Sequence, residues 1–229
     1  MKKIFLSLLI VTLIASPIYA ATATTTPTLY EITVTRIEIR NASTLAWTTL
    51  GTGSQAFNIA SINVGEAVGN FISNADVEPG TYDALRVTLS RNIGVTAQTS
   101  VSGTPYYTTA TQYDNFGDPS EIQGKGIVIS SAVSSPSKGT FQVPDEAPSG
   151  APAGYSQSID VGSNTLICTM AGAAFGSPIT IQQGVPTTLR ITFDVTNAAI
   201  FEDDFDNGNP GDPTPVGYID PPLIEVTTI

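Results

Sequence analysis

The stretch VEPGTYDALRVTL, residues 77–89, is the most regular part of the chain and decides the fold class. Its Pro-Gly pair predicts a tight turn. After the turn, apolar and polar residues alternate, so Leu85, Val87 and Leu89 are expected to face a core and the polar residues between them to face outward. The stretch therefore predicts a turn followed by a long central β-strand with one buried face.

A second stretch, GVPTTLRITF at residues 184–193, has the same layout. In both stretches a Gly precedes a Leu-Arg pair by five residues, and a β-branched residue, a Thr and an apolar residue follow. Internal duplication and a shared pattern of strand residues both account for the match. Either way, the two segments are expected to have the same structural role.

The segment Leu29–Arg40 contains apolar residues that alternate in two phases. Tyr30, Ile32 and Val34 share one face, whereas the isoleucines at 37 and 39 share the other. A β-bulge near residue 35 or 36 would bring both sets to the same side of a sheet. The segment is thus expected to be a long, bulged strand.

Shorter stretches of β-branched and aromatic residues recur between clusters of Gly, Pro, Asn and Asp. They predict further strands at Leu45–Leu50, Ala56–Ile59, Gly126–Val133, Gly139–Val143, Thr165–Met170 and Leu223–Ile229. Loops are expected at Gly51–Ser54, Val143–Tyr155 and Glu202–Asp212. Helical period is found only in Ile62–Ser73, where it predicts at most one short helix.

These patterns predict an all-β protein, an antiparallel β-sandwich of immunoglobulin-like or transthyretin-like type with long loops. Residues 21–229 are expected to form one domain, with a looser inserted region at about 94–180. No linker in this span separates two domains.

The first twenty residues have the features of a secretory signal peptide. Lys2 and Lys3 precede the apolar run Ile4–Ile14, and small residues follow. Cleavage is expected after Ala20, with Ala23 as the alternative; a retained signal anchor is the other interpretation. No Cys stands at the junction to carry a lipid, and no later stretch is apolar enough to span a membrane. The protein is expected to be secreted, extracellular or at the cell surface, with the periplasm possible in transit.

The composition excludes several classes of function. The 229 residues contain no His and one Cys, which removes His-dependent catalysis, His-ligated zinc and intrachain disulfides. A net charge of -11 argues against nucleic acid as a partner, because phosphate binding needs clustered Lys and Arg. The single Cys168 lies in an apolar run and is expected to be a buried structural thiol.

Several segments resemble, in the same order, an uncharacterised family of bacterial secreted β-sandwich domains. They are Ile32–Ile39, Trp47–Leu50, the turn Val77–Tyr82 before Leu85–Val87, and Gly184 leading into Leu189–Val195. The resemblance covers roughly residues 28–90 and 178–229. It implies a transthyretin-like or immunoglobulin-like fold and export, and it supplies no catalytic residues. Many members look like lipoproteins, but this chain lacks the lipid-anchor cysteine.

Carboxylates are the abundant reactive groups, so an acid and base pair for glycoside hydrolysis is one candidate site. The possible members are Asp76, Glu78, Asp83, Asp160 and Asp194. Their spacing fixes no two carboxylates at the required separation. Asp83 is expected at a turn and Asp194 on the polar face of a strand, so no enzymatic activity is expected.

The acidic segment Glu202–Asp212 is the candidate metal site. Carboxylates crowded near glycines suit Ca²⁺, with Asp204, Asp206 and Asp212 as the expected ligands. The segment does not fit an EF-hand loop: with Gly208 at the sixth position, Phe205 would stand at the third position, which should supply a calcium ligand. A solvated acidic loop without metal is the alternative, and no other cofactor is expected.

Four aromatic residues form the candidate ligand site: Tyr106, Tyr107, Tyr113 and Phe116. They lie in a Thr-rich segment with acidic and amide side chains, which can together hold a sugar ring. The alternative is that some of the tyrosines belong to the core of a hairpin.

Two functions remain. The first is a non-enzymatic structural subunit of the bacterial cell surface, in a fibre, pilus-like or matrix assembly, that joins copies of itself or other surface proteins by β-strand addition. The donor candidates are Thr28, Leu29, Tyr30, Ile32 and Val34, which continue the Thr-rich lead from Ala21; Leu223–Ile229 is a second candidate donor. The alternative function is a secreted glycan- or ligand-binding module, with calcium a possible requirement.

Overall fold

The computed structural model describes residues 21–60, 70–72, 75–116, 124–145, 153–205, 214–220 and 223–228. In these residues the chain forms 16 β-strands, and its one helical element is the 3-10 turn η1, Gly172–Ala174. The nearly all-β class predicted from the sequence is confirmed. The signal segment 1–20 lies outside the described residues, as does most of Ile62–Ser73, where a short helix was predicted.

Along the sequence, most neighbouring strands are separated by only a few residues. Their bounds are β1 Thr22–Thr25, β2 Leu29–Asn41, β3 Trp47–Asn58, β4 Gly80–Ser90, β5 Asn92–Thr96, β6 Gln98–Val101, β7 Thr104–Phe116, β8 Gly124–Ser130, β9 Gly139–Gln142, β10 Tyr155–Asp160, β11 Thr165–Ala171, β12 Ile179–Ile181, β13 Leu189–Asp194, β14 Ala199–Phe205, β15 Thr214–Ile219 and β16 Leu223–Thr228.

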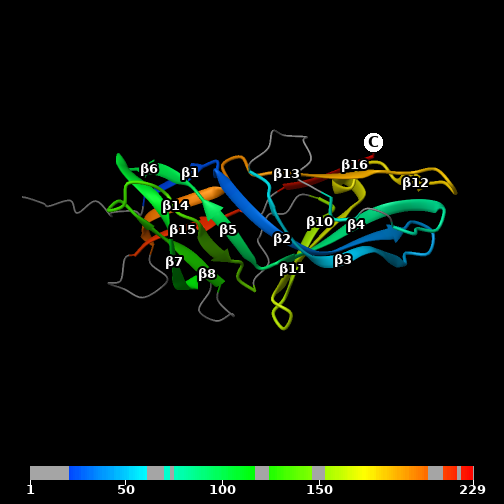
Figure 1. Ribbon diagram of the computed structural model, residues 1–229, viewed down its shortest axis with the longest axis horizontal. Helices are drawn as coiled ribbons and strands as arrows, with labels where there is room; N and C mark the ends of the chain where they lie inside the picture. The colour runs from blue at the N-terminus through cyan, green and yellow to red at the C-terminus, as the bar shows by residue number, and fades with distance from the viewer. Residues whose placement is uncertain are drawn as a thin grey trace, which may run out of the picture.

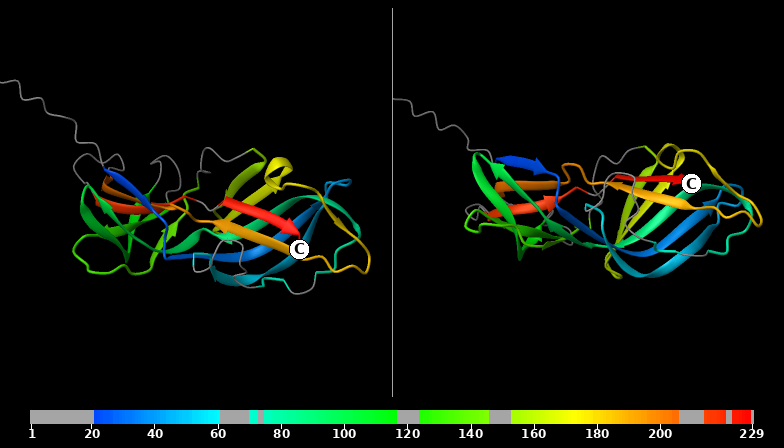
Figure 2. Two further views of the ribbon diagram at one scale, coloured as in Figure 1. Left: turned by 90° about the horizontal axis from the view of Figure 1, so that it is seen from above. Right: turned by 45° about the horizontal axis from the view of Figure 1, so that its top comes forward.

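Fourteen strands form one antiparallel sheet with the order β1-β14-β15-β8-β9-β5-β2-β4-β11-β10. Off this path, β3 pairs with β2, β12 pairs with β4, and β6 pairs with β7, which pairs with β8. The molecule is elongated (Figure 1), with β1, β6–β8, β14 and β15 at one end and β3, β4 and β10–β12 toward the other. Strands β13 and β16 form a separate two-stranded sheet, and their apolar side chains pack against the core. Figure 2 shows this pair beside the strands of the large sheet.

Strand β2 connects the two ends, and its predicted bulge is confirmed. Its first residues pair with β5 and its later residues with β4. Between Val34 and Arg36 the register with β4 shifts, so that two residues of β2 oppose one of β4. The extra residue is Thr35, whose hydroxyl donates a hydrogen bond to the carbonyl oxygen of Thr88 (3.1 Å). The shift turns both apolar sets of β2 to the core, where Tyr30, Ile32 and Ile39 are fully buried.

Strand β4 also confirms its prediction. Leu85, Val87 and Leu89 are buried, and the residues between them are partly exposed. β4 lies between β2 on one side and β11 and β12 on the other, so it is a central strand. The Tyr82 hydroxyl donates a hydrogen bond to the carbonyl oxygen of Glu78 (2.7 Å), which ties the start of β4 to the preceding turn.

Three further predictions are wrong, each for a physical reason. Residues 47–58 were expected to be two strands around a turn at Gly51–Ser54, but they form the single strand β3. Its glycines have a different role, because a Cβ on Gly51 would lie 2.6 Å from Cγ1 of Ile72, and a Cβ on Gly53 would touch the ring of Phe71. The glycines leave room for these apolar side chains to approach the sheet.

The prediction that the second Leu-Arg segment would be a long central strand is the second error. β13 has only 6 residues, and β16 is its partner in the described part of the chain. The third error concerns the acidic segment expected to be a loop from Glu202. Its first residues continue strand β14 as far as Phe205.

The middle of the chain supplies strands to both ends of the molecule. β8 pairs with β15, β9 pairs with β5, and β11 pairs with β4, so these strands of residues 94–180 belong to the large sheet. The strands predicted near β8, β9, β11 and β16 are confirmed within a few residues. Among the residues that the structure describes, none forms a helix long and apolar enough to cross a membrane.

Arg91 joins three segments at the point where β4 passes into β5. It is 3% exposed, and its Nε donates a hydrogen bond to the carbonyl oxygen of Val143 (2.7 Å). The backbone N–H of Arg91 donates to the carbonyl oxygen of Asn164 (3.1 Å), and the carbonyl oxygen of Arg91 accepts the backbone N–H of Val143 (3.0 Å). Burial lowers the pKa of the guanidinium, and the charge of Asp145 offsets part of this shift. Arg91 thus fixes the junction by satisfying buried backbone groups.

Candidate functional site

The four aromatic residues predicted to bind a ligand all lie on β7, and two of them are on opposite faces of the sheet. Tyr106 and Tyr107 are adjacent in the strand, so their side chains point to opposite faces of the sheet. Tyr106 packs against the core, as expected for the hairpin alternative. Tyr113 follows after a shift of register between Thr108 and Gln112, and the side chain of Phe116 is outside the described part of the structure.

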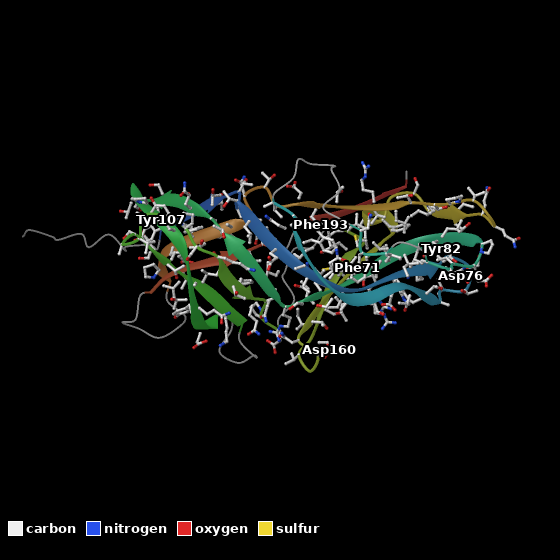
Figure 3. The ribbon with its side chains drawn as sticks, in the orientation of Figure 1. Phe71, Asp76, Tyr82, Tyr107, Asp160 and Phe193 are labelled. Atoms are coloured by element: carbon white, nitrogen blue, oxygen red, sulfur yellow. The ribbon has the colours of Figure 1, made fainter. Side chains whose placement is uncertain are left out.

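The strand that carries these tyrosines also takes part in an ion pair. Asp114, two-thirds exposed, forms an ion pair with Lys125 (2.8 Å) on the neighbouring strand β8. Figure 3 shows Tyr107 at one end of the molecule, far from Tyr82 and Asp76 at the other. The structure therefore places Tyr106 and Tyr107 on opposite faces of β7, so these two rings do not form one aromatic platform.

The predicted calcium ligands are only partly covered by the structure. Asp204 lies in strand β14, whereas Asp206 and Asp212 fall outside the described residues. In the described ranges, no three acidic or Cys side chains are placed to hold a metal ion. Calcium binding by this segment remains a prediction.

Two of the carboxylates that are candidates for catalysis, Asp83 and Asp160, have structural partners. Asp83 is in strand β4 rather than at a turn, and it accepts two hydrogen bonds from Arg40 (2.9 and 3.1 Å). Asp160 accepts the backbone N–H of Ser163 (3.2 Å), and hydrogen bonds from Ser163 hold the pKa of Asp160 below its ordinary value. Figure 3 shows Asp160 and Asp76 in different parts of the molecule. The structure therefore does not bring Asp160 and Asp76 together as an acid and base pair.

A cluster of charged side chains around Trp47 covers the outer face of β2, β3 and β4. Glu38 is 6% exposed and binds both Arg86 (2.8 Å) and Arg36 (2.9 Å). The guanidinium of Arg86 lies 4.2 Å from the centre of the Trp47 ring, and that of Arg40 lies 5.8 Å from it. Cation–π stacking and ion pairs thus connect three strands.

Side chains of the Trp47 cluster also bind residues on the neighbouring strands. Arg36 also donates to the hydroxyl of Thr49 on β3 (2.8 Å), and Arg40 is engaged by Asp83. The arrangement therefore clamps β3 onto β2 and β4. The sequence contains a signal for it, since Arg36, Glu38 and Arg40 alternate on one face of β2, but the partners on β3 and β4 depend on the strand register.

The outer edge of β3 is protected by irregularity. The strand contains no charged residue and no Pro, and β2 is its partner in the described part of the sheet. Its register with β2 shifts twice, between Val34 and Arg36 and between Ile37 and Glu38. Bulges of this kind twist an edge and disfavour pairing with another chain. β3 is thus a poorer acceptor than its composition alone suggests.

The donor-strand candidates lie in β2 and at its start. Tyr30, Ile32 and Val34 are buried in the core of their own chain, and Leu29 is paired with Thr96 of β5. Thr28 donates its backbone N–H to the carbonyl oxygen of Thr96 (2.8 Å). The Tyr30 hydroxyl donates to the carbonyl oxygen of Asp220 (3.0 Å), which adds a contact 190 residues away in sequence.

Strand β1, just before these candidates, is held differently. It pairs only with β14 in the described part of the chain, through the four pairs Thr22 with Glu202, Ala23 with Phe201, Thr24 with Ile200 and Thr25 with Ala199. Its side chains are Ala and Thr, alternately exposed and partly buried. Residues 26–28 connect it to β2, with Pro27 buried.

The N-terminal side of β1 is anchored by a reciprocal contact with Asp203 of β14. The backbone nitrogen of Ala21 donates to Oδ1 of Asp203 (3.0 Å), and the backbone N–H of Asp203 donates to the carbonyl oxygen of Ala21 (3.3 Å). These residues are 182 positions apart, so sequence patterns gave no signal for the contact.

The single thiol is confirmed as buried. Cys168 lies on β11 and is 1% exposed. Burial raises the pKa of its thiol to about 11, and hydrogen bonds with Tyr155 and Gln157 offset part of the rise. Burial likewise raises the pKa of Tyr155 and of Tyr30 well above the ordinary value. These groups stay neutral at physiological pH, so the thiol is structural.

Comparisons with known proteins give no relative. No family of known proteins matches the chain, no curated protein is significantly similar to it, and no solved structure matches its fold.

Proposed function

We propose that the chain is an exported, non-enzymatic structural subunit of the cell surface, which associates with copies of itself by exchanging its N-terminal strand. The observation that carries the proposal is the position of β1. It is the first strand of the chain beyond the predicted signal segment, it lies at the margin of the large sheet, and β14 is its partner among the described strands.

Detaching β1 removes little from the core. Its four residues, Thr-Ala-Thr-Thr, bury no large apolar side chain, whereas β2 pairs with β3, β4 and β5 and buries several. Hydrophobic stabilisation scales with buried apolar area, so β1 contributes far less than β2. The vacated edge of β14 can accept β1 of a second copy, which restores the same four register pairs between two chains.

The proposal confines the donor to β1. Among the donor candidates, Tyr30, Ile32 and Val34 are buried in their own core, so donating them would dismantle the central strand of the sheet. Thr28 and Leu29 then mark the end of the exchanged segment, after which the chain stays in its own subunit. The linker of residues 26–28 is short, and short linkers favour exchange between chains over return to the same chain.

The wider features of the chain agree with this function. Apolar side chains of the pair β13–β16 pack against the core, and we propose that the chain is a β-sandwich of the immunoglobulin-like or transthyretin-like class. Signal features at residues 1–20 favour export, and the chain has few reactive side chains. A partner can form hydrogen bonds with the hydroxyl side chains and with the backbone groups at the strand edges of such a surface.

The proposal is tested by cross-linking β1 to its own chain. Thr24 and Ile200 face each other in the register of β1 and β14, so the double variant Thr24→Cys/Ile200→Cys can form a disulfide within one subunit. The buried Cys168 does not compete. The mature chain is expected to form oligomers in light scattering and filaments in negative-stain micrographs, and the oxidised variant is expected to stay monomeric until reduced.

A matched control uses a strand pair that is not exchanged. Ser156 and Thr169 face each other in β10 and β11, and the variant Ser156→Cys/Thr169→Cys should assemble whether oxidised or reduced. Assembly of the oxidised β1 variant at the rate of this control would rule out strand exchange. A mature chain that remains monomeric at all concentrations would rule out the structural subunit itself.

A further inference from the structure

We infer that Asp203 binds the α-ammonium group that signal removal creates at Ala21. Two independent observations meet at this residue. The sequence predicts cleavage after Ala20, and the structure places the nitrogen of Ala21, the residue after that bond, 3.0 Å from Oδ1 of Asp203.

The geometry suits capture of a chain terminus. The hydrogen bond from Asp203 N–H to the carbonyl oxygen of Ala21 (3.3 Å) fixes the residue from its other side. Ala21 is partly buried and its side chain packs against the core, and Asp203 is also partly buried. A carboxylate and a backbone N–H therefore hold one residue at both of its backbone polar groups.

Cleavage changes the strength of this contact. Before cleavage, the nitrogen of Ala21 belongs to an amide and donates one neutral N–H. Hydrolysis of the Ala20–Ala21 bond by a signal peptidase consumes one water and leaves a carboxylate on Ala20 and an ammonium on Ala21. The ammonium places a full positive charge beside the Asp203 carboxylate, and the attraction between the two charges is added to the hydrogen bond, so the processed chain holds β1 more tightly than the precursor.

The contact also separates the two predicted cleavage sites. Cleavage after Ala20 leaves β1 whole, whereas cleavage after Ala23 would remove its first two residues and the Ala21–Asp203 contact. The structure thus favours Ala20. The inference rests on the predicted export and not on strand exchange, so it holds for a monomer as well as for an assembly.

The test is a double-mutant cycle on the monomeric protein. One chain begins at Ala21, and the second carries one extra Gly before Ala21, which returns that nitrogen to an amide. Asp203→Asn is made in both, and hydrogen exchange at the β1 amides is measured. The substitution is expected to lower β1 protection about three- to tenfold in the first chain and less than twofold in the extended chain.

A neighbouring charge serves as the control. Glu202 precedes Asp203 on β14 and lies opposite Thr22 in the strand register, so Glu202→Gln removes the same charge and should change β1 protection equally in the two chains. Equal losses for Asp203→Asn in both chains would overturn the inference, because the contact would then be an ordinary amide hydrogen bond. So would an exported protein whose mass shows that it begins at residue 24. Neither result bears on whether the subunits assemble.

Discussion

Two segments of the chain share one sequence pattern and occupy opposite positions in the fold. Leu-Arg-Val-Thr-Leu at 85–89 forms the middle of β4, with β2 on one side and β11 on the other. Leu-Arg-Ile-Thr-Phe at 189–193 forms β13, which is paired with β16 in a two-stranded sheet. The difference teaches that alternation determines which side chains of a strand are buried, whereas the neighbouring strands determine how deeply.

The side chains of the two segments show this difference position by position. Leu85 is fully buried, whereas Leu189 is only partly buried. Arg86 is engaged by Glu38 and Trp47, whereas Arg190 is exposed. The two segments therefore provide matched variants with identical chemistry in different surroundings.

The largest expected effect is on the leucines. Leu85→Ala should lower the free energy of unfolding by about 3–4 kcal/mol, since it leaves a cavity in the core, and Leu189→Ala by about 1 kcal/mol, since water can reach the site. Urea unfolding of both variants measures the difference. Equal losses would mean that β13 is as deeply packed as β4.

A second expected effect concerns alkaline pH and the strand beside β4. Cys168 faces Val87 across β11 and β4, and burial raises the pKa of its thiol from 9.0 to about 11. Because the unfolded thiol ionises first, stability is complete below pH 9 and is lost as the pH rises to about 11. The loss from this group is about 2 kcal/mol at pH 11.

The variant Cys168→Ala isolates that contribution. It should lower stability at neutral pH through the smaller side chain, and it should flatten the decline between pH 9 and 11, as measured by urea unfolding at each pH. An unchanged decline would assign it to the buried phenols Tyr30 and Tyr155 instead, whose pKa values burial also raises.

These differences explain how much of the fold the sequence could predict. The bulge at Thr35 and the buried face of β4 follow from periodicity, which is a local property. The position of β13 does not follow from periodicity, because its neighbouring strands depend on how the whole fold is assembled. Gly51 was misread for the same reason, since the side chain that needs its space comes from Ile72.

The candidate sites were harder to predict from sequence than the fold. The tyrosines of β7 are close in sequence, yet Tyr106 and Tyr107 face opposite sides because strand side chains alternate. The Ala21–Asp203 contact joins residues 182 positions apart, and the Trp47 cluster joins three strands. Contacts of this kind depend on strand register, which a single sequence does not determine.

A third, smaller effect is expected at the two arginines. Arg86→Ala removes the ion pair with buried Glu38 and the stacking on Trp47, and it should cost about 1–2 kcal/mol. Arg190→Ala should stay within about 0.5 kcal/mol, as is usual for an exposed side chain. Trp47 is the only Trp of the chain, so its fluorescence reports the change directly.

The fluorescence measurement has its own control. Arg86→Lys keeps the charge but loses the planar guanidinium, so it should shift the emission of Trp47 in the same direction as Arg86→Ala, while Arg190→Ala leaves it unchanged. A shift caused by Arg190→Ala would contradict the separate environments of the two strands.

The smallest effect comes at the position that ends each segment, where Ser90 corresponds to Asp194. Both side chains accept the backbone N–H two residues later, Ser90 from Asn92 (3.1 Å) and Asp194 from Thr196 (2.8 Å). Only the carboxylate titrates, and its hydrogen bonds with Thr196 hold the pKa of Asp194 below the ordinary value of 3.8. The contribution of Asp194 to the free energy of unfolding is therefore present above pH 3.8 and is lost as the pH falls through the lowered pKa.

Exchanging these two residues should transfer that pH dependence from one strand to the other. Asp194→Ser keeps an acceptor but removes the charge, so it should reduce the acid sensitivity of stability below pH 4 by a few tenths of a kcal/mol, since the exposed site is screened by solvent. Ser90→Asp should add acid sensitivity at the end of β4, where the same hydrogen bond is available. Acid titrations followed by circular dichroism measure both. If Ser90→Asp adds none, the local hydrogen bond does not control the titration, and the surroundings of the two strands differ at this position as well.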